Sequence, residues 1–249
     1  MKTWRRPSNE RDQGISLVEL MVTMMVMGIV IAATATLVIG AQRTNAQSIA
    51  RLDQVESARN AVERMSRTLR ASVMPSQLLS SCAGCTEDAF VRGEDYAVQF
   101  YANIDNPRNT VGPSRVTYTV TETAPGVADL TQTIQVPNSP TPTATGYQYC
   151  DASTDTSPAC QGRVQAMVIA RGVLLDPARP LITYYSADGQ LATSGGALSA
   201  SDLSRVLAVE LQVTVQQQTS FQALPTTYIQ RILLPNAQAV IRQGEEEAP

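Results

Sequence analysis

The stretch GISLVEL, residues 14–20, decides how the rest of this chain is organised. It opens an apolar run, and residues 20–42 contain no charged side chain. A helix needs about 20 such residues to cross the roughly 30 Å hydrocarbon core of a bilayer. Glu19 stands inside the apolar segment, where a carboxylate is costly unless it has a partner or a purpose. The stretch therefore predicts a membrane helix that carries one functional carboxylate.

Residues 1–14 form a polar leader in front of this run, with four basic and two acidic side chains. Basic residues stay on the cytoplasmic side of a membrane, so the leader predicts a cytoplasmic N-terminus and an exported remainder. A secretory signal peptide has an apolar core of about 7–15 residues with its cleavage site behind it. Here the apolar run is longer, and the candidate cleavage site, after Gly14, precedes the run. A plain signal-anchor helix remains as an alternative.

Gly14, Ile15 and Glu19, between a basic leader and a long apolar helix, resemble the start of a type IV prepilin or a type II secretion pseudopilin. In that family a prepilin peptidase cuts after a glycine and methylates the new N-terminus. The resemblance therefore implies cleavage after Gly14 and methylation of Ile15. The family's usual residue after the cut is phenylalanine, so Ile15 is an apolar departure from the pattern. The resemblance covers roughly the first 30 residues.

Glu19 matches the glutamate that follows the cut at the fifth position in this family. The resemblance implies an assembly role, in which Glu19 pairs with the new α-amino group of Ile15 on a neighbouring subunit. Such a pair would neutralise both charges inside an apolar bundle and set the axial register of incoming subunits. The alternative is a carboxylate that snorkels to the lipid headgroups.

The helix is expected to continue beyond the membrane, because residues 41–74 contain neither proline nor glycine. One helix from Ile15 to about Val73 would be ~88 Å long and would end before Pro75. The first half would meet lipid or other subunits, whereas the second would pack on the chain's own domain. That packing face follows spacings of three and four residues, namely Leu52, Val55, Ala58, Val62, Met65, Leu69 and Val73.

Two further departures point away from a major filament subunit. Major pilins carry a helix-bending proline where this chain has Thr36, and no proline occurs between Pro7 and Pro75. A thin-filament subunit is also typically smaller than this chain. Within the family, the resemblance therefore favours a larger minor pilin or pseudopilin.

The charge balance lowers the expectation of a nucleic-acid partner. From Ile15 onward the chain has 15 Arg against 20 Asp plus Glu, and from Val73 onward 9 Arg against 16 acidic residues, a net of −7. A phosphate-binding surface needs the opposite sign. The chain has no histidine, and it has no phosphate-binding loop or nucleophile elbow. We expect no enzyme activity, no cofactor and no metal site.

Four cysteines fit an oxidising, exported location, where an even number indicates disulfides. Local pairs are favoured, because each would staple a loop, although crossed pairing stays open. The spacing is wrong for a four-cysteine zinc site. The candidate pairs are Cys82–Cys85 and Cys150–Cys160.

The remaining chain predicts one β-rich domain, because short segments alternate apolar and polar residues and favour Val, Ile, Thr and Tyr. The predicted strands cover residues 96–102, 115–121, 130–136, 164–170, 181–191 with an Asp-Gly turn, 205–216 and 226–234. The predicted fold class is α+β, a long N-terminal transmembrane helix packed on a C-terminal antiparallel β-sheet domain. The expected division is 1–14 leader, 15–42 membrane and assembly helix, 43–74 amphipathic continuation, 75–243 exported β-rich domain and 244–249 acidic tail.

These observations predict a minor pilin or pseudopilin, a structural, initiating or tip subunit of a type IV pilus-like or type II secretion-like filament. The expected partners are a prepilin peptidase, other pilin or pseudopilin subunits, an inner-membrane assembly platform and membrane lipid. The expected location is a single-pass inner-membrane protein with an exported C-terminal domain, later part of a pilus or pseudopilus. The alternative is a membrane-anchored, exported, adhesin-like binding protein that never assembles.

Overall fold

The computed structural model describes residues 14–78, 88–216 and 224–234. The chain divides between Ser48 and Ile49 into two compact units. Helix α1, Leu17–Arg70, begins in the first unit and ends in the second. The other described elements lie in the second unit, so the fold is α+β, with an N-terminal helix that packs on an antiparallel sheet, as the sequence predicts.

In the first unit, α1 exposes every side chain up to Asn45. Its backbone groups bond within the helix, as hydrocarbon requires of a membrane-spanning segment. Its threonine hydroxyls also bond internally. Thr23 donates to Leu20 O at 2.9 Å and Thr34 donates to Val30 O at 2.9 Å. This part of the helix therefore leaves no hydroxyl donor for lipid to solvate.

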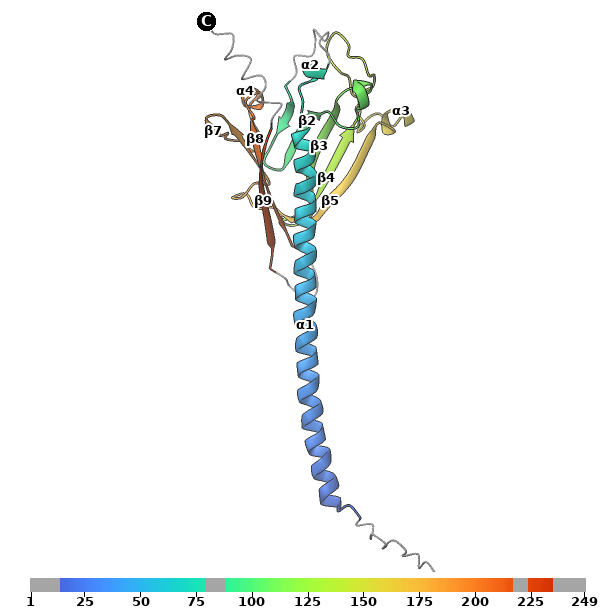
Figure 1. Ribbon diagram of the computed structural model, residues 1–249, viewed down its shortest axis with the longest axis vertical. Coiled ribbons are helices and arrows are strands. Elements are labelled where there is room, and N and C mark those ends of the chain that lie inside the picture. Colours follow the sequence, from blue (N-terminus) through green and yellow to red (C-terminus); the bar gives the residue numbers. More distant parts are fainter. Residues whose placement is uncertain (1–13, 79–87, 217–223, 235–249) are drawn as a thin grey trace, which may run out of the picture. The chain divides into compact units, whose positions relative to one another are not determined.

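The second unit contains one antiparallel sheet, in which the described strands follow the order β1-β2-β3-β4-β5-β8-β6-β7, with β9 paired to β8. Figure 1 shows this sheet curving around the C-terminal part of α1. The strands are β1 Phe90–Gly93, β2 Ala97–Ala102, β3 Ser114–Ala124, β4 Val127–Gln135, β5 Val164–Leu174, β6 Ile182–Ser186, β7 Gly189–Gln190, β8 Ala208–Val215 and β9 Thr226–Leu233. Short helical turns complete the unit, namely α2 Pro75–Leu78, η1 Pro107–Asn109, α3 Pro158–Gln161 and α4 Ala200–Leu203.

The second half of α1 packs on the sheet, as expected, but its buried face differs from the predicted one. Leu52 is 64% exposed and Val55 is half-buried, so including Leu52 in the packing face was wrong. Gln54 lies on the buried side instead, where its Oε1 accepts a hydrogen bond from Thr226 Oγ1 at 3.4 Å. The residues of α1 that are buried are Ala50, Gln54, Ala58, Ala61, Val62, Met65, Ser66 and Leu69.

The end of α1 comes earlier than Val73, because the chain turns to join the sheet. Ser72 forms a bridge with Ala102, and Val73 N–H donates to Tyr101 O at 3.0 Å. These backbone groups have left the helical pattern before Pro75 is reached. Pro75 instead starts α2, where its missing N–H costs nothing.

Several strand boundaries also differ from the sequence prediction. The strand predicted over residues 164–170 is longer, because β5 continues to Leu174 and Val173 pairs with both Ala128 of β4 and Val215 of β8. The residues between β6 and β7 are Ala187 and Asp188, while Gly189 already belongs to β7, with φ at +132°. Strand β8 begins at Ala208 and pairs with β9 along its whole length, in the antiparallel direction predicted for the sheet.

The core of the second unit lies between the buried face of α1 and the concave side of the sheet. Two aromatic pairs tie neighbouring strands together. The ring centroids of Phe90 and Phe100 are 5.7 Å apart, and those of Phe100 and Tyr118 are 6.3 Å apart. The largest apolar and aromatic side chains that are fully buried are Met65, Leu69, Phe100, Tyr118, Leu130, Ile182, Tyr184, Leu211, Ile232 and Leu234.

Candidate functional site

The bond between Gly14 and Ile15 lies outside the helix, at its N-terminal end. Residues 14–16 have no regular structure and α1 starts at Leu17. Apart from the chain neighbours of Gly14, no described atom lies within 4 Å of the position that a Cβ on Gly14 would occupy, and Ile15 is 72% exposed. A peptidase therefore finds this bond outside regular structure and uncovered by described neighbours. The rest of the predicted leader lies outside the described residues.

The helix behind this bond presents an apolar surface on all sides. An 18-residue window of α1 reaches a mean hydropathy of 2.4, and none of its residues is buried. By length and composition this helix can cross a membrane. Its large exposed side chains include Leu17, Val18, Leu20, Met21, Val22, Met24, Met25, Val26, Met27, Ile29, Val30, Ile31, Leu37, Val38 and Ile39. Such a surface must be covered by lipid or by other helices.

Glu19 lies in the first turn of α1, and its side chain is exposed. Among the described residues it has no ion-pair or hydrogen-bond partner. A carboxylate at a helix N-terminus interacts favourably with the helix dipole, worth about 0.3–1 kcal/mol at an exposed site. That gain is much smaller than the cost of placing a charge in hydrocarbon, about 2.5 kcal/mol or more. Any stronger partner for Glu19 must therefore come from outside the described chain.

Gly28 and Thr36 shape the middle of the apolar helix. Apart from the helix's own backbone, no described atom lies within 4 Å of the position that a Cβ on Gly28 would occupy, so a side chain there would meet no other part of the described chain. At Thr36 the helix is unbroken, and the hydroxyl donates to Ala32 O at 2.5 Å. The threonine therefore keeps its polar atom within the helix at the position where major pilins have a proline.

A buried polar network fastens the second half of α1 to the sheet. Arg64 Nε donates to Gln132 Oε1 at 2.6 Å, and Gln132 Nε2 donates to Tyr118 Oη at 2.7 Å. A further hydrogen bond, between the hydroxyls of Tyr118 and Thr68, returns this network to α1. Burial raises the pKa of the Tyr118 hydroxyl to about 12. Sequence reasoning missed this network, because no local pattern indicates that residues 64 and 132 meet.

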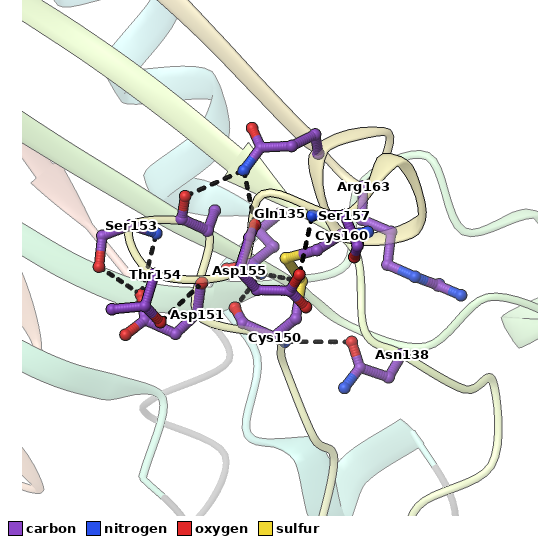
Figure 2. The surroundings of a disulfide bond; sticks show 12 residues. Gln135, Asn138, Cys150, Asp151, Ser153, Thr154, Asp155, Ser157, Cys160 and Arg163 are labelled. Carbon is purple, nitrogen blue, oxygen red and sulfur yellow. Dashed lines mark hydrogen bonds between the residues drawn. A yellow bond between two sulfur atoms is a disulfide. The ribbon is translucent and has the colours of Figure 1, made fainter.

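The loop between β4 and β5 is stapled by a disulfide between Cys150 and Cys160, the local pair that the sequence favours. Figure 2 shows its surroundings. Gln135 Nε2 donates to Cys150 O at 2.6 Å, and Cys150 N–H donates to Asn138 Oδ1 at 3.1 Å. Ser157 caps α3 by accepting from Cys160 N–H at 3.3 Å. The disulfide therefore closes the loop on itself, and the hydrogen bond from Gln135, the last residue of β4, ties the closed loop to the sheet. Cys82 and Cys85, the other candidate pair, lie outside the described residues.

The same loop contains a group of side chains with metal-ligand chemistry. Single ligand atoms of Cys150, Asp155 and Cys160 lie within 4.8 Å of one another. The two sulfur atoms are bonded to each other, so neither is a thiolate, and a metal needs thiolates. Asp155 is exposed, and the backbone N–H of Ser157 donates to its carboxylate at 2.9 Å. In the oxidised chain this group acts as a loop staple.

Comparison with known proteins matches residues 10–35 to the prokaryotic N-terminal methylation motif. The match spans the Gly14–Ile15 bond, Glu19 and the first half of the apolar helix. Neither the curated proteins nor the solved structures give a match to this chain. The motif is the prepilin-type signal, and its position on a long apolar helix fits a single-pass membrane anchor with an exported C-terminal domain. The chain thus carries a prepilin-type methylation signal and is consistent with a structural, type IV pilin-like protein.

Proposed function

We propose that this chain is a minor pilin or pseudopilin, cut after Gly14, methylated on Ile15 and assembled through α1 into a type IV pilus-like or type II secretion-like filament. One observation carries the proposal. Glu19 has no partner among the described residues, yet it stands in the first turn of an apolar helix that carries the methylation motif. An intramembrane carboxylate of this kind needs a partner from another molecule.

Cleavage after Gly14 creates that partner. The new α-amino group of Ile15 is a cation at neutral pH, and on a neighbouring subunit it can approach Glu19 within an apolar bundle. Pairing neutralises both charges, and hydrocarbon makes the alternative of two unpaired charges unfavourable. The distance between Ile15 and Glu19 along the helix then sets the axial offset of successive subunits. A prepilin peptidase, an inner-membrane assembly platform and other subunits are the partners that this sequence of events requires.

A minor role, as an initiating or tip subunit, is supported by three features of the chain. Ile15 replaces the usual phenylalanine, and Thr36 stands where a major pilin has a proline. The exported domain is also large, with a curved sheet that covers one face of α1. A subunit that repeats along a thin filament shaft would place this large domain at every position of the shaft. A tip or initiating subunit carries it once.

Substitution of Glu19 tests the proposal. In cells that assemble the filament, Glu19→Ala should leave cleavage after Gly14 intact and should lower incorporation at least about tenfold, since one unpaired α-amino charge remains. Glu19→Gln is the matched control for shape, and it should fail similarly, because its neutral amide keeps the size and hydrogen-bonding capacity of the side chain but lacks the negative charge. Sheared filaments and membranes are separated, and the subunit is quantified in each. Normal incorporation of both variants would contradict the pairing.

A further inference from the structure

Strand β9 pairs with β8 along its whole length and, among the described residues, with no strand on its other side. Leu234 N–H donates to Leu207 O at 2.9 Å, so the even-numbered backbone groups face the β8 side. Because bonding alternates along an antiparallel ladder, the N–H and C=O groups of Thr227, Ile229, Arg231 and Leu233 point away from β8. A row of unpaired backbone groups at a sheet edge is a template for another strand.

A groove of about 390 Å³ lies between this strand and α1. Arg67 and Arg70 are exposed, and they have no ion-pair partner among the described residues. Glu63 is the one acidic residue at the groove, and it already pairs with Arg59, Nε to Oε1, at 2.6 Å. The groove therefore has an excess of positive charge. Its lining residues are Glu63, Ser66, Arg67, Arg70 and Gln230.

Gln230 adds an unmet hydrogen-bond acceptor to this groove. Its Oε1 atom is buried, and it has no donor among the described residues. A buried polar atom without a hydrogen bond destabilises the chain, so a ligand that supplies an N–H or O–H group gains affinity there. A simple anion such as phosphate would satisfy the arginines alone. An occupant that carries both carboxylates and donors, as a polypeptide does, satisfies all three groups.

The two faces of β9 define which side chains such a polypeptide would carry. Ile229 and Leu233 lie on the outer face, and they are 57% and 63% exposed. Gln230 lies on the opposite face, toward α1 and its arginines. Side chains of a strand alternate between the faces of a sheet, so an added strand would present every second residue to each environment.

We propose that the free edge of β9 binds an extended segment of another polypeptide, in which acidic and apolar residues alternate. The acidic side chains contact Arg67 and Arg70, a donor reaches Gln230 Oε1, and the apolar side chains cover Ile229 and Leu233. Backbone hydrogen bonds to β9 supply the rest of the affinity, as in other cases of strand addition. The proposal rests on the second unit alone, so it stands or fails independently of the proposed function.

A binding experiment tests this inference with the full chain in detergent micelles. The probe is a fluorescent peptide of the same eight-residue length as β9, with alternating glutamate and valine. The control peptide has lysine in place of each glutamate. The glutamate peptide should bind at least about tenfold more tightly than the lysine peptide, a ratio that should shrink as salt screens the arginines. Equal binding of both peptides, or no binding, would overturn the proposal.

Two sets of variants locate the binding site. Ile229→Pro removes an N–H from the free edge and should weaken binding about tenfold, whereas Ile229→Ala keeps that donor and should change binding less. Arg67→Glu with Arg70→Glu should reverse the preference toward the lysine peptide. Arg51→Glu, on the same helix away from the groove, is the matched control and should keep the original preference. Since the arginines are exposed, these variants should fold normally, and thermal melting verifies this.

The chain's own acidic segment, residues 244–249, is the competing occupant. A variant that lacks these residues separates the two cases. Peptide affinity that is unchanged by the deletion supports the binding of another polypeptide. Binding that appears only after the deletion would overturn the proposal in favour of an intramolecular contact.

Discussion

Residues 17–48 and residues 49–70 belong to one helix, but the first stretch exposes its apolar side chains and the second buries most of them against the sheet. In the first stretch Met25 is 71% exposed, and no residue of the most apolar window is buried. In the second, Met65 is fully buried between the helix and the sheet. The first stretch contains residues 20–40, which are apolar on all sides, whereas the second stretch is apolar on one face only. A helix of uniform geometry can therefore serve two environments when its side-chain pattern changes along its length.

The polar groups of the two stretches differ in the same way. Thr34 bonds to its own helix backbone, and Glu19 has no partner among the described residues. Arg64 and Thr68, by contrast, join a network with Gln132 and Tyr118 in the sheet. The buried face of the second stretch therefore finds its packing and hydrogen-bond partners within its own unit. The apolar surface of the first stretch must be covered by lipid or by other helices, and this contrast gives the following predictions.

The largest expected difference comes from removing a methionine side chain in each stretch. Met65→Ala should lower the free energy of unfolding of the β domain by about 2–5 kcal/mol, because it leaves a cavity in the core. Met25→Ala is the matched control and should change that free energy by less than about 0.5 kcal/mol, since the Met25 side chain is mostly exposed and lies outside the core of the β domain. Denaturant titration in detergent measures both. Equal effects would mean that the two stretches are not distinguished by their own packing.

Removal of the Cys150–Cys160 disulfide should have the next largest effect. Changing both cysteines to serine releases a loop of ten-residue separation, which should cost about 2–3 kcal/mol of stability in the chain-entropy estimate. The same loss should follow when the wild-type chain is reduced. Unchanged melting under reducing conditions would show that the hydrogen bonds of Gln135 and Asn138 hold the loop without the disulfide.

Tyr118→Phe removes the central hydroxyl of the buried network. It should lower the free energy of unfolding by about 1–3 kcal/mol, because Gln132 loses its hydrogen-bond acceptor in the core. Arg59→Ala serves as the polar control. It breaks an exposed ion pair with Glu63 and should cost less than about 1 kcal/mol. If both substitutions cost the same, the network would not be what fastens α1 to the sheet.

Tyr118 also predicts a pH dependence. Its folded pKa, about 12, is raised above the unfolded value of about 10, so the folded state holds the proton more tightly. The stabilisation is complete below pH 10 and is lost as pH rises toward 12, by up to about 1.4 kcal/mol per pH unit. Tyr118→Phe should reduce this alkaline loss in thermal melts between pH 8 and 11.5. An identical pH profile for the variant would exclude Tyr118 as its source.

Local patterns predicted the elements of this fold better than its long-range contacts. The apolar run, the methylation signal and the alternating strands are encoded within short windows, so the helix, Gly14 and β8–β9 could be found. Leu52 satisfied the helical spacing but faces outward, because tertiary packing selects Gln54 for the buried side. The pairing of Arg64 with Gln132 bridges 68 positions, and no periodicity indicates it. Strand β5 extends beyond the predicted residue 170 for the same reason, because Val173 pairs with Val215 of β8, which is distant in the sequence.

The mass of the mature chain tests the central claim most directly. The protein is purified from membranes of cells that contain a prepilin peptidase, and its N-terminal peptide is sequenced by mass spectrometry. We predict a chain that lacks residues 1–14 and begins at Ile15 with one added methyl group on its α-amino nitrogen. A chain that keeps its leader would contradict the account and would leave a membrane-anchored protein that never enters a filament.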